Sequence, residues 1–310
     1  MRHLARRVVQ IVPTMLGALL LVFVVMRVLP GDPAIALLGT AATPDAVAAL
    51  RRDLGVDRPL LDQFVAYLAG AFRLDFGQSL ALRAPVGRLV LDALPHTLLL
   101  TLGGTLVATL IGVPLGATAA LRRGTWLDYA AGIGALLGVS VPVFVWGLVL
   151  LLTFGLHWRV FPTAGAGATP AEVLRALVLP AIATGFFLAG VVSRITRASI
   201  LQMLGQDFAR TARAKGLGER AVVGRHVLRN AIIPILTVIG LNVGTLLSGA
   251  VVAETVFTRP GIGRLALDAI LARDYPVIQG VVLVSSFAVL LLNLVVDLLY
   301  GLADPRVRAT

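Results

Sequence analysis

The chain has no cysteine and only one lysine, and both scarcities limit its possible chemistry. Without cysteine it has no disulfides, no thiolate metal ligands and no cysteine nucleophile. Lys215 lies between Ala214 and Gly216, so the G-x-x-x-x-G-K-[ST] loop of a P-loop ATPase is missing. Charged residues are also few: they make up 14% of the 310 residues, against 58% hydrophobic residues and a mean hydropathy of +0.92. This composition predicts that most of the chain lies in lipid.

Motifs of membrane hydrolases are missing as well. There is no H-E-x-x-H, and Leu246-Leu247 breaks the G-x-S-x-G pattern around Ser248. Asp297 is the only aspartate within an apolar stretch, whereas aspartyl intramembrane catalysis needs two. We therefore expect no catalytic residue, no metal site and no bound cofactor, and an intramembrane hydrolase is the third-ranked function.

Six stretches without a charged residue approach or exceed the ~20 apolar residues that a helix needs to cross a bilayer. They are residues 8–26, 93–121, 129–158, 176–193, 230–253 and 275–296. The first is longer than the apolar core of a secretory signal, which favours a retained anchor. The sequence thus predicts an all-α membrane protein with six transmembrane helices.

The formal charge of +11 indicates the orientation of these helices. Six spans place both termini on one side, where the tails and loops carry 15 basic and four acidic residues; the opposite side carries 11 of each. Because basic loops stay inside, we expect cytoplasmic termini. The charge is then an orientation signal rather than a nucleic-acid footprint.

The largest segment outside the spans, residues 31–92, falls on the outer side. Thr43-Pro44-Asp45 has the chemistry of a helix start, and Gly55 stands where that helix would stop. A second helix is expected from about Pro59. We predict a small helical subdomain on the outer membrane surface.

The cytoplasmic segment 194–229 carries eight basic and two acidic residues. Gly216-Leu217-Gly218 interrupts two helical stretches, and Ala212, Ala214 and Gly216 form a small-residue surface on which another protein could seat. Contact with lipid phosphates would explain the charge. It would not explain a helix–break–helix pattern in so long a connection.

An ion-coupled carrier would place ionisable groups within the membrane. The candidates, Arg27 and Asp297, fall at opposite ends of their spans, so structural anchoring is the better interpretation, with Arg27 facing outward or meeting Glu254. A stand-alone secondary carrier remains the alternative from another class. It would transport on an ion gradient without partners.

Several segments resemble, in order, the permease subunits of dipeptide/oligopeptide ABC importers. They are RRVVQIVPTMLGALLLVFVVMRVLPGDP (6–33), LPHTLLLTL (94–102), PLGATAALRRGTWLD (114–128), RTARAKGLGERAVVGRHVLRNAIIP (210–234), AETVFTRPGIGRL (253–265), ARDYPVIQG (272–280) and NLVVDLLYGLADPRVR (293–308). The resemblance covers essentially the whole chain.

The resemblance implies a type I ABC importer permease in a bacterial inner membrane. It also implies a second, usually non-identical permease, two cytoplasmic ATPases that bind ATP and Mg, and an external binding protein that delivers peptide. The family's coupling motif E-A-A-x-x-x-G, aligned on Gly216, falls on Arg210, Thr211 and Ala212, of which only Ala212 matches. The expected ATPase-docking residues are Arg210, Thr211, Ala212, Arg213, Ala214, Lys215, Gly216, Leu217, Gly218 and Arg225.

The expected organisation is a cytoplasmic tail with the first span (1–30), an external helical subdomain (31–95) and a core permease domain (96–310) with its coupling loop at about 194–230. In the core, Asn242, Gly244 and Ser248 are the candidates for the substrate path. Other possible cargoes for the same machine are nickel complexes, glutathione or another small solute.

Overall fold

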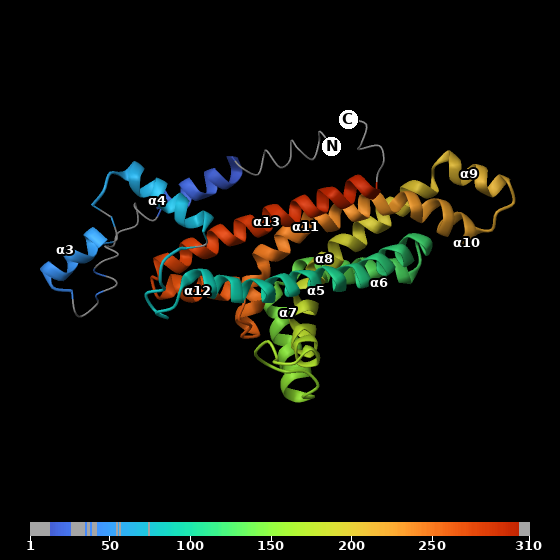
Figure 1. The fold of residues 1–310 in the computed structure, drawn as a ribbon. Helices are drawn as coiled ribbons and strands as arrows, with labels where there is room; N and C mark the ends of the chain where they lie inside the picture. The colour runs from blue at the N-terminus through green and yellow to red at the C-terminus, as the bar shows by residue number, and fades with distance from the viewer. Residues whose placement is uncertain are drawn as a thin grey trace. The chain divides into compact units, whose positions relative to one another are not determined.

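The computed structural model describes residues 13–25, 35, 38, 42–53, 55, 57–73 and 75–303, and the regular elements in that part are helices (Figure 1). The chain forms two compact units, residues 1–95 with 261–290 and residues 96–260 with 291–310. Arg27 and the side chain of Asp297 lie outside the described residues, so their predicted anchoring stays a prediction.

Four long helices have the length and apolar character of membrane spans, and they match four of the six predicted windows. They are α5 (Val86–Leu121), α8 (Pro170–Leu204), the stretch Glu219–Val256 that includes α11 (Leu228–Val256), and α13 (Tyr275–Ala303). Of the first window the structure describes Pro13–Val25, an apolar helix of 13 residues.

The third window, 129–158, is not one straight helix. It divides into α6 (Trp126–Ser140) and α7 (Val143–Leu150), which continues as a π-helical segment to His157, and the two halves are bent by 103°. Pro142 has no N–H to continue the helix and restricts the residue before it, so Val141 is extended, with φ −86° and ψ 123°. The prediction of a single helix is therefore wrong here.

The first unit contains the two short helices predicted before the second span. The first of them, α3 (Pro44–Asp53), starts after Thr43, and Gly55 follows its end at φ +66°, while α4 (Leu60–Phe72) starts after Pro59. Both predicted helices are confirmed.

The core of the first unit joins the end of α4 to α12 (Ile262–Leu271) and α13. Among its buried residues are Ala71, Val86, Ile262 and Val277. Asp274, only 1% exposed, accepts hydrogen bonds from the Ser79 hydroxyl at 2.5 Å and the Ala81 amide at 3.1 Å, which fastens the chain before α5 to the start of α13.

The second unit is built around α8. Of the apolar window of α8, 67% is buried, against 28–39% in the other three spans, because α6, α7 and α11 all pack on it. Glycines allow the closest approaches: a methyl group at Gly112 of α5 would lie 2.7 Å from the Ala189 carbonyl oxygen, and one at Gly138 of α6 2.6 Å from the Phe186 carbonyl oxygen. Small residues bring backbones together in this way where lipid provides little force for association.

Candidate functional site

The loop between α8 and α11 folds as two short helices around a glycine turn, as predicted. Its first helix, α9 (Asp207–Ala214), is followed by residues 215–218, by α10 (Glu219–Ala221) and by a π-helical segment, Val222–Val227. Gly216 has φ +81°, a conformation that glycine adopts without steric cost. In Figure 1, α9 and α10 lie together beyond the ends of α8 and α11.

One face of this loop is attached to the helical bundle by small apolar side chains. Its buried members, Ala209, Ala212, Val222 and Val227, cluster with side chains at the ends of the spans, namely Ala120, Ile200 and Ala231. The expectation that Ala212 forms part of an outward surface is therefore corrected. Ala212 is 5% exposed because it fills the seam between α9 and the bundle.

The opposite face of the loop is exposed and basic. Nine of the ten predicted docking residues are exposed: Arg210, Thr211, Arg213, Ala214, Lys215, Gly216, Leu217, Gly218 and Arg225. Phe208, a residue of α9 that is 37% exposed, is not among the predicted docking residues. An apolar residue next to basic groups in a short polar helix is the pattern that could have identified it, since aromatic and arginine side chains are enriched in interfaces.

An ion pair closes the glycine turn. The Arg213 guanidinium donates to both carboxylate oxygens of Glu219, from Nε at 2.5 Å and from Nη2 at 3.4 Å, and Nη1 lies 3.5 Å from the Leu204 carbonyl oxygen. The hydrogen bond to Glu219 raises the pKa of Arg213. One side chain thus connects α9 to α10 and to the end of α8.

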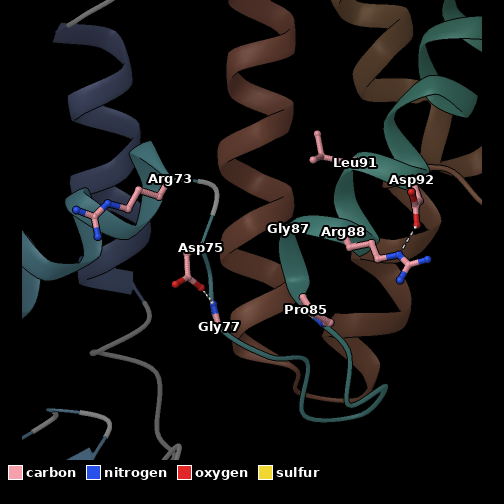
Figure 2. A pocket seen from close by; sticks show the side chains of 8 residues that line it. All are labelled: Arg73, Asp75, Gly77, Pro85, Gly87, Arg88, Leu91 and Asp92. Atoms are coloured by element: carbon pink, nitrogen blue, oxygen red, sulfur yellow. Dashed lines mark hydrogen bonds and ion pairs between the residues drawn. The ribbon is translucent and has the colours of Figure 1, made fainter.

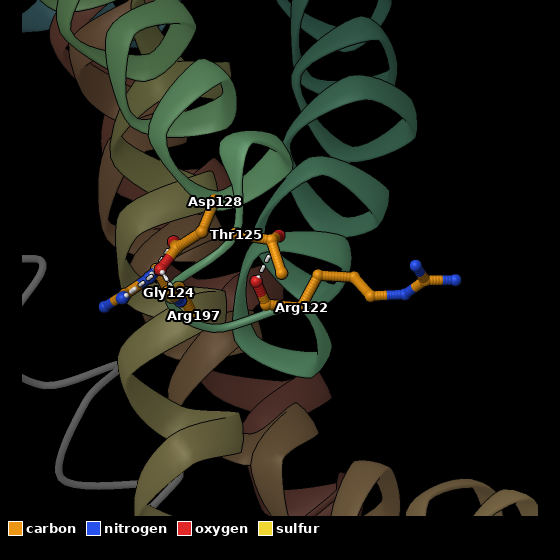
Figure 3. A network of polar contacts seen from close by, with 5 residues as sticks. All are labelled: Arg122, Gly124, Thr125, Asp128 and Arg197. Atoms are coloured by element: carbon orange, nitrogen blue, oxygen red, sulfur yellow. Dashed lines mark hydrogen bonds and ion pairs between the residues drawn. The ribbon is translucent and has the colours of Figure 1, made fainter.

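A second polar network fixes the short turn between α5 and α6 (Figure 3). Arg197 of α8 donates to both oxygens of Asp128, at 2.7 and 2.8 Å, and the Gly124 amide donates to the same carboxylate at 3.1 Å. Gly124 has φ +78°. The side chain of Arg122 extends away from this network, while its carbonyl oxygen accepts from the Thr125 hydroxyl at 2.5 Å.

Buried charges gather at the other end of α11. Glu254 and Arg259 are fully buried, at 0% exposure, and the Thr97 hydroxyl of α5 donates to Glu254 at 2.5 Å. Arg259 donates from Nη1 to the Ala176 carbonyl oxygen of α8 at 3.1 Å. Burial lowers the pKa of Arg259, and the nearby Glu254 carboxylate opposes that shift.

The three residues predicted to line the substrate path do not share one face of α11. Successive residues of an α-helix are rotated by about 100°, so Gly244 and Ser248 are neighbours one turn apart, with Asn242 well to one side. Ser248 is exposed and donates to the Gly244 carbonyl oxygen at 3.2 Å. Asn242 is half-buried and donates to the Val238 carbonyl oxygen at 2.8 Å. The structure thus brings two of the three together.

A cavity of 480 Å³ opens in the first unit (Figure 2). Its charged groups do not converge: Arg88 pairs with Asp92 at 3.7 Å, Asp75 accepts from the Gly77 amide at 3.1 Å, and Arg73 points away from the other three. In the described ranges, no three histidine, aspartate or glutamate side chains come together in a way that could hold a metal ion.

Comparison with known proteins assigns the family. Residues 112–309 match the family of binding-protein-dependent transport system inner membrane components, and residues 1–101 match the N-terminal part of such membrane components. The dipeptide transport system permease protein DppB of Escherichia coli K12 is 38% identical over 335 residues, covering 99% of both chains. A di/tripeptide transport system permease protein of Pseudomonas aeruginosa UCBPP-PA14 is 40% identical over 329 residues, covering 98% of both.

Solved structures agree with this family in fold. An inward-facing methionine ABC transporter, MetNI, matches with a TM-score of 0.57 at 16% identity, over 70% of this chain and 96% of that one. The match to these relatives over nearly the whole length, together with the family model over residues 112–309, shows that the chain belongs to the binding-protein-dependent transport system inner membrane components, the permease subunits of ABC transporters.

Proposed function

We propose that this permease forms half of the translocation pathway of an ABC importer for dipeptides and short peptides. The support is the full-length similarity to permeases whose names specify dipeptides or di/tripeptides. In this proposal the chain moves solute by alternating access and performs no covalent chemistry. A second, non-identical permease completes the pathway, two ATPases bind ATP and Mg, and a binding protein delivers peptide from outside.

The proposed topology has six spans, the type I importer arrangement, with both termini in the cytoplasm. Residues 1–30 hold the tail and first span, 31–95 the external subdomain and 96–310 the core. The basic excess on the side of the coupling loop supports this orientation. The bent α6–α7 pair then serves as one of the six spans.

The exposed face of residues 207–218 is the proposed ATPase-docking surface. Its apolar side is already occupied by the bundle, so a partner meets Arg210, Lys215, Phe208 and Leu217, while Arg213 holds α9 and α10 together. Acidic groups around an ATPase cleft would complement this charge. The Gly244–Ser248 face of α11 is the proposed contact with substrate, and the position of Asn242 to one side of it makes that residue a weaker candidate.

Uptake of a labelled dipeptide tests the assignment of the cargo. A strain lacking this gene should lose uptake of a labelled dipeptide and regain it with the wild-type chain, because no other subunit supplies this half of the pathway. If the deletion strain takes up dipeptide normally but loses uptake of another solute, the peptide assignment is wrong and the assignment as a permease stands.

The docking surface is tested by Gly218→Trp. Gly218 has φ −65° and nothing within 4 Å of an added methyl group, so the variant adds bulk without backbone strain. We expect uptake to fall at least ~10-fold while ATP hydrolysis by the complex becomes independent of substrate, an effect of ~1.4 kcal/mol on docking. Gly132→Trp in α6 also meets open space and is the control. Equal uptake by both variants would place the docking surface elsewhere.

A further inference from the structure

Pro180 leaves one carbonyl group of the central helix without its usual donor. In an α-helix the N–H of each residue bonds the carbonyl four residues earlier, and proline has no N–H. Pro180 lies inside α8, so the Ala176 carbonyl oxygen lacks the N–H donor that residue 180 would otherwise supply. Ala176 is 7% exposed, and an unpaired buried carbonyl is destabilising.

Arg259 supplies the missing hydrogen bond from a different part of the chain. Its Nη1 donates to the Ala176 carbonyl oxygen at 3.1 Å, across 83 residues of sequence. Arg259 follows the end of α11, and its own amide donates to the Glu254 carbonyl oxygen at 2.8 Å. The side chain therefore joins the end of α11 to α8 at the position where Pro180 interrupts the hydrogen-bond ladder.

The surroundings of Arg259 favour this role over direct contact with solute. The guanidinium is fully buried, with Glu254 as the nearby opposite charge. Its remaining donors, Nε and Nη2, are buried and have no hydrogen-bond partner in the part of the chain that the structure describes. Phe257, two residues before Arg259, belongs to the same apolar cluster as Leu179 of α8, so apolar contacts join the same two elements.

We propose that Arg259 is a positioning residue for transport, which replaces the donor absent at Pro180 and couples the end of α11 to α8. The inference rests on the permease function of the chain and does not depend on its cargo. α8 leads directly into α9 and the proposed docking surface. A displacement of α8 near Ala176, where Arg259 binds it, can therefore be transmitted along this one helix to the ATPase.

A rescue experiment tests the proposal in the complete transporter, purified with its partner subunits. Arg259→Met is made together with Glu254→Gln, so that no buried carboxylate loses its nearby cation. Pro180→Ala is then added, because alanine restores an N–H to the Ala176 carbonyl oxygen. Pro234→Ala is the matched control, since Pro234 is also inside a spanning helix, α11.

The main measurement is the ratio of binding-protein-stimulated to basal ATP hydrolysis. Relative to Glu254→Gln alone, we expect Arg259→Met to lower this ratio about tenfold, a loss of ~1.4 kcal/mol. Pro180→Ala should restore most of it, and Pro234→Ala should not. Arg259→Lys, which keeps a donor, should retain more of the ratio than Arg259→Met does.

The proposal is overturned if Arg259→Met leaves the ratio unchanged, or if Pro180→Ala fails to restore it or does no better than Pro234→Ala. If Arg259→Met prevents assembly, the amount of complex recovered from membranes becomes the measurement, with the same order of variants expected. Thermal unfolding of the complex is followed in parallel. The unfolding temperature depends on the Arg259–Ala176 bond whichever solute is carried. A wrong peptide assignment can therefore be distinguished from a wrong role for Arg259.

Discussion

Two buried threonines one turn apart in α5 have different partners. The Thr97 hydroxyl donates to the fully buried Glu254 carboxylate at 2.5 Å, whereas the Thr101 hydroxyl donates to the Thr97 carbonyl oxygen at 2.9 Å within the helix. The two are exposed by only 3% and 2%. The two threonines are therefore equally buried, and they differ in whether the hydrogen-bond acceptor is charged.

We expect Thr97→Val to destabilise the purified protein by ~1.5–3 kcal/mol, because the variant removes a hydrogen bond to a buried charged group. Thr101→Val should cost less than ~1 kcal/mol, since a hydroxyl bonded back to its own helix contributes little. Thermal unfolding in detergent compares the pair. Equal losses would mean that the Glu254 carboxylate draws no particular stability from Thr97.

At the scale of single residues, the sequence shows which side chains are charged but does not predict most of their partners. The Arg197–Asp128 and Arg259–Ala176 contacts join residues 69 and 83 positions apart, and no periodicity relates them. Gly55 and Gly216 could be predicted, because a turn after a short helix requires a positive φ that glycine tolerates.

At the scale of the helices, close packing of α5 on α8 depends on glycine. A methyl group at Gly116 would overlap the Ser193 carbonyl oxygen and lie 2.7 Å from the Thr196 Cβ. Gly132 of α6, by contrast, has nothing within 4 Å. Gly116→Ala should therefore separate two backbones.

We expect Gly116→Ala to destabilise the protein by about 1–3 kcal/mol through overpacking. Gly132→Ala should be neutral or stabilising by up to ~1 kcal/mol, because alanine favours the helix. Unfolding of both variants under the same conditions gives the comparison. A neutral Gly116→Ala would show that α5 and α8 can separate without cost.

The coupling loop allows a charge-swap test. Exposed ion pairs add little stability, so the Arg213–Glu219 pair should matter chiefly by holding α9 and α10 in one arrangement. Arg213→Glu should lower uptake several-fold with normal amounts of protein in the membrane, and the double change Arg213→Glu with Glu219→Arg should recover it. No recovery would indicate that Arg213 contacts the ATPase itself.

Helix boundaries show what a hydropathy pattern can and cannot predict. Charge-free windows located α5, α8, α11 and α13, because lipid and the protein interior both select apolar residues. The same windows underestimated α8, which extends over 35 residues, 17 more than its window of 18. They also missed the 103° bend at Val141–Pro142, since proline within an apolar span is compatible with either a kink or a straight helix.

For the molecule as a whole, the absence of cysteine makes the proposed orientation directly testable. Lys215→Cys at the glycine turn and Gln63→Cys on α4 place single thiols at proposed cytoplasmic and external positions, and Ala183→Cys, at 0% exposure, is the buried control. In intact spheroplasts a membrane-impermeant maleimide should label Gln63→Cys alone. Lys215→Cys should react only after permeabilisation, because Lys215 lies on the side that carries 15 basic and four acidic residues, and basic loops stay in the cytoplasm. Labelling of Lys215→Cys from outside would invert the topology and remove the docking surface from the side where ATP is available.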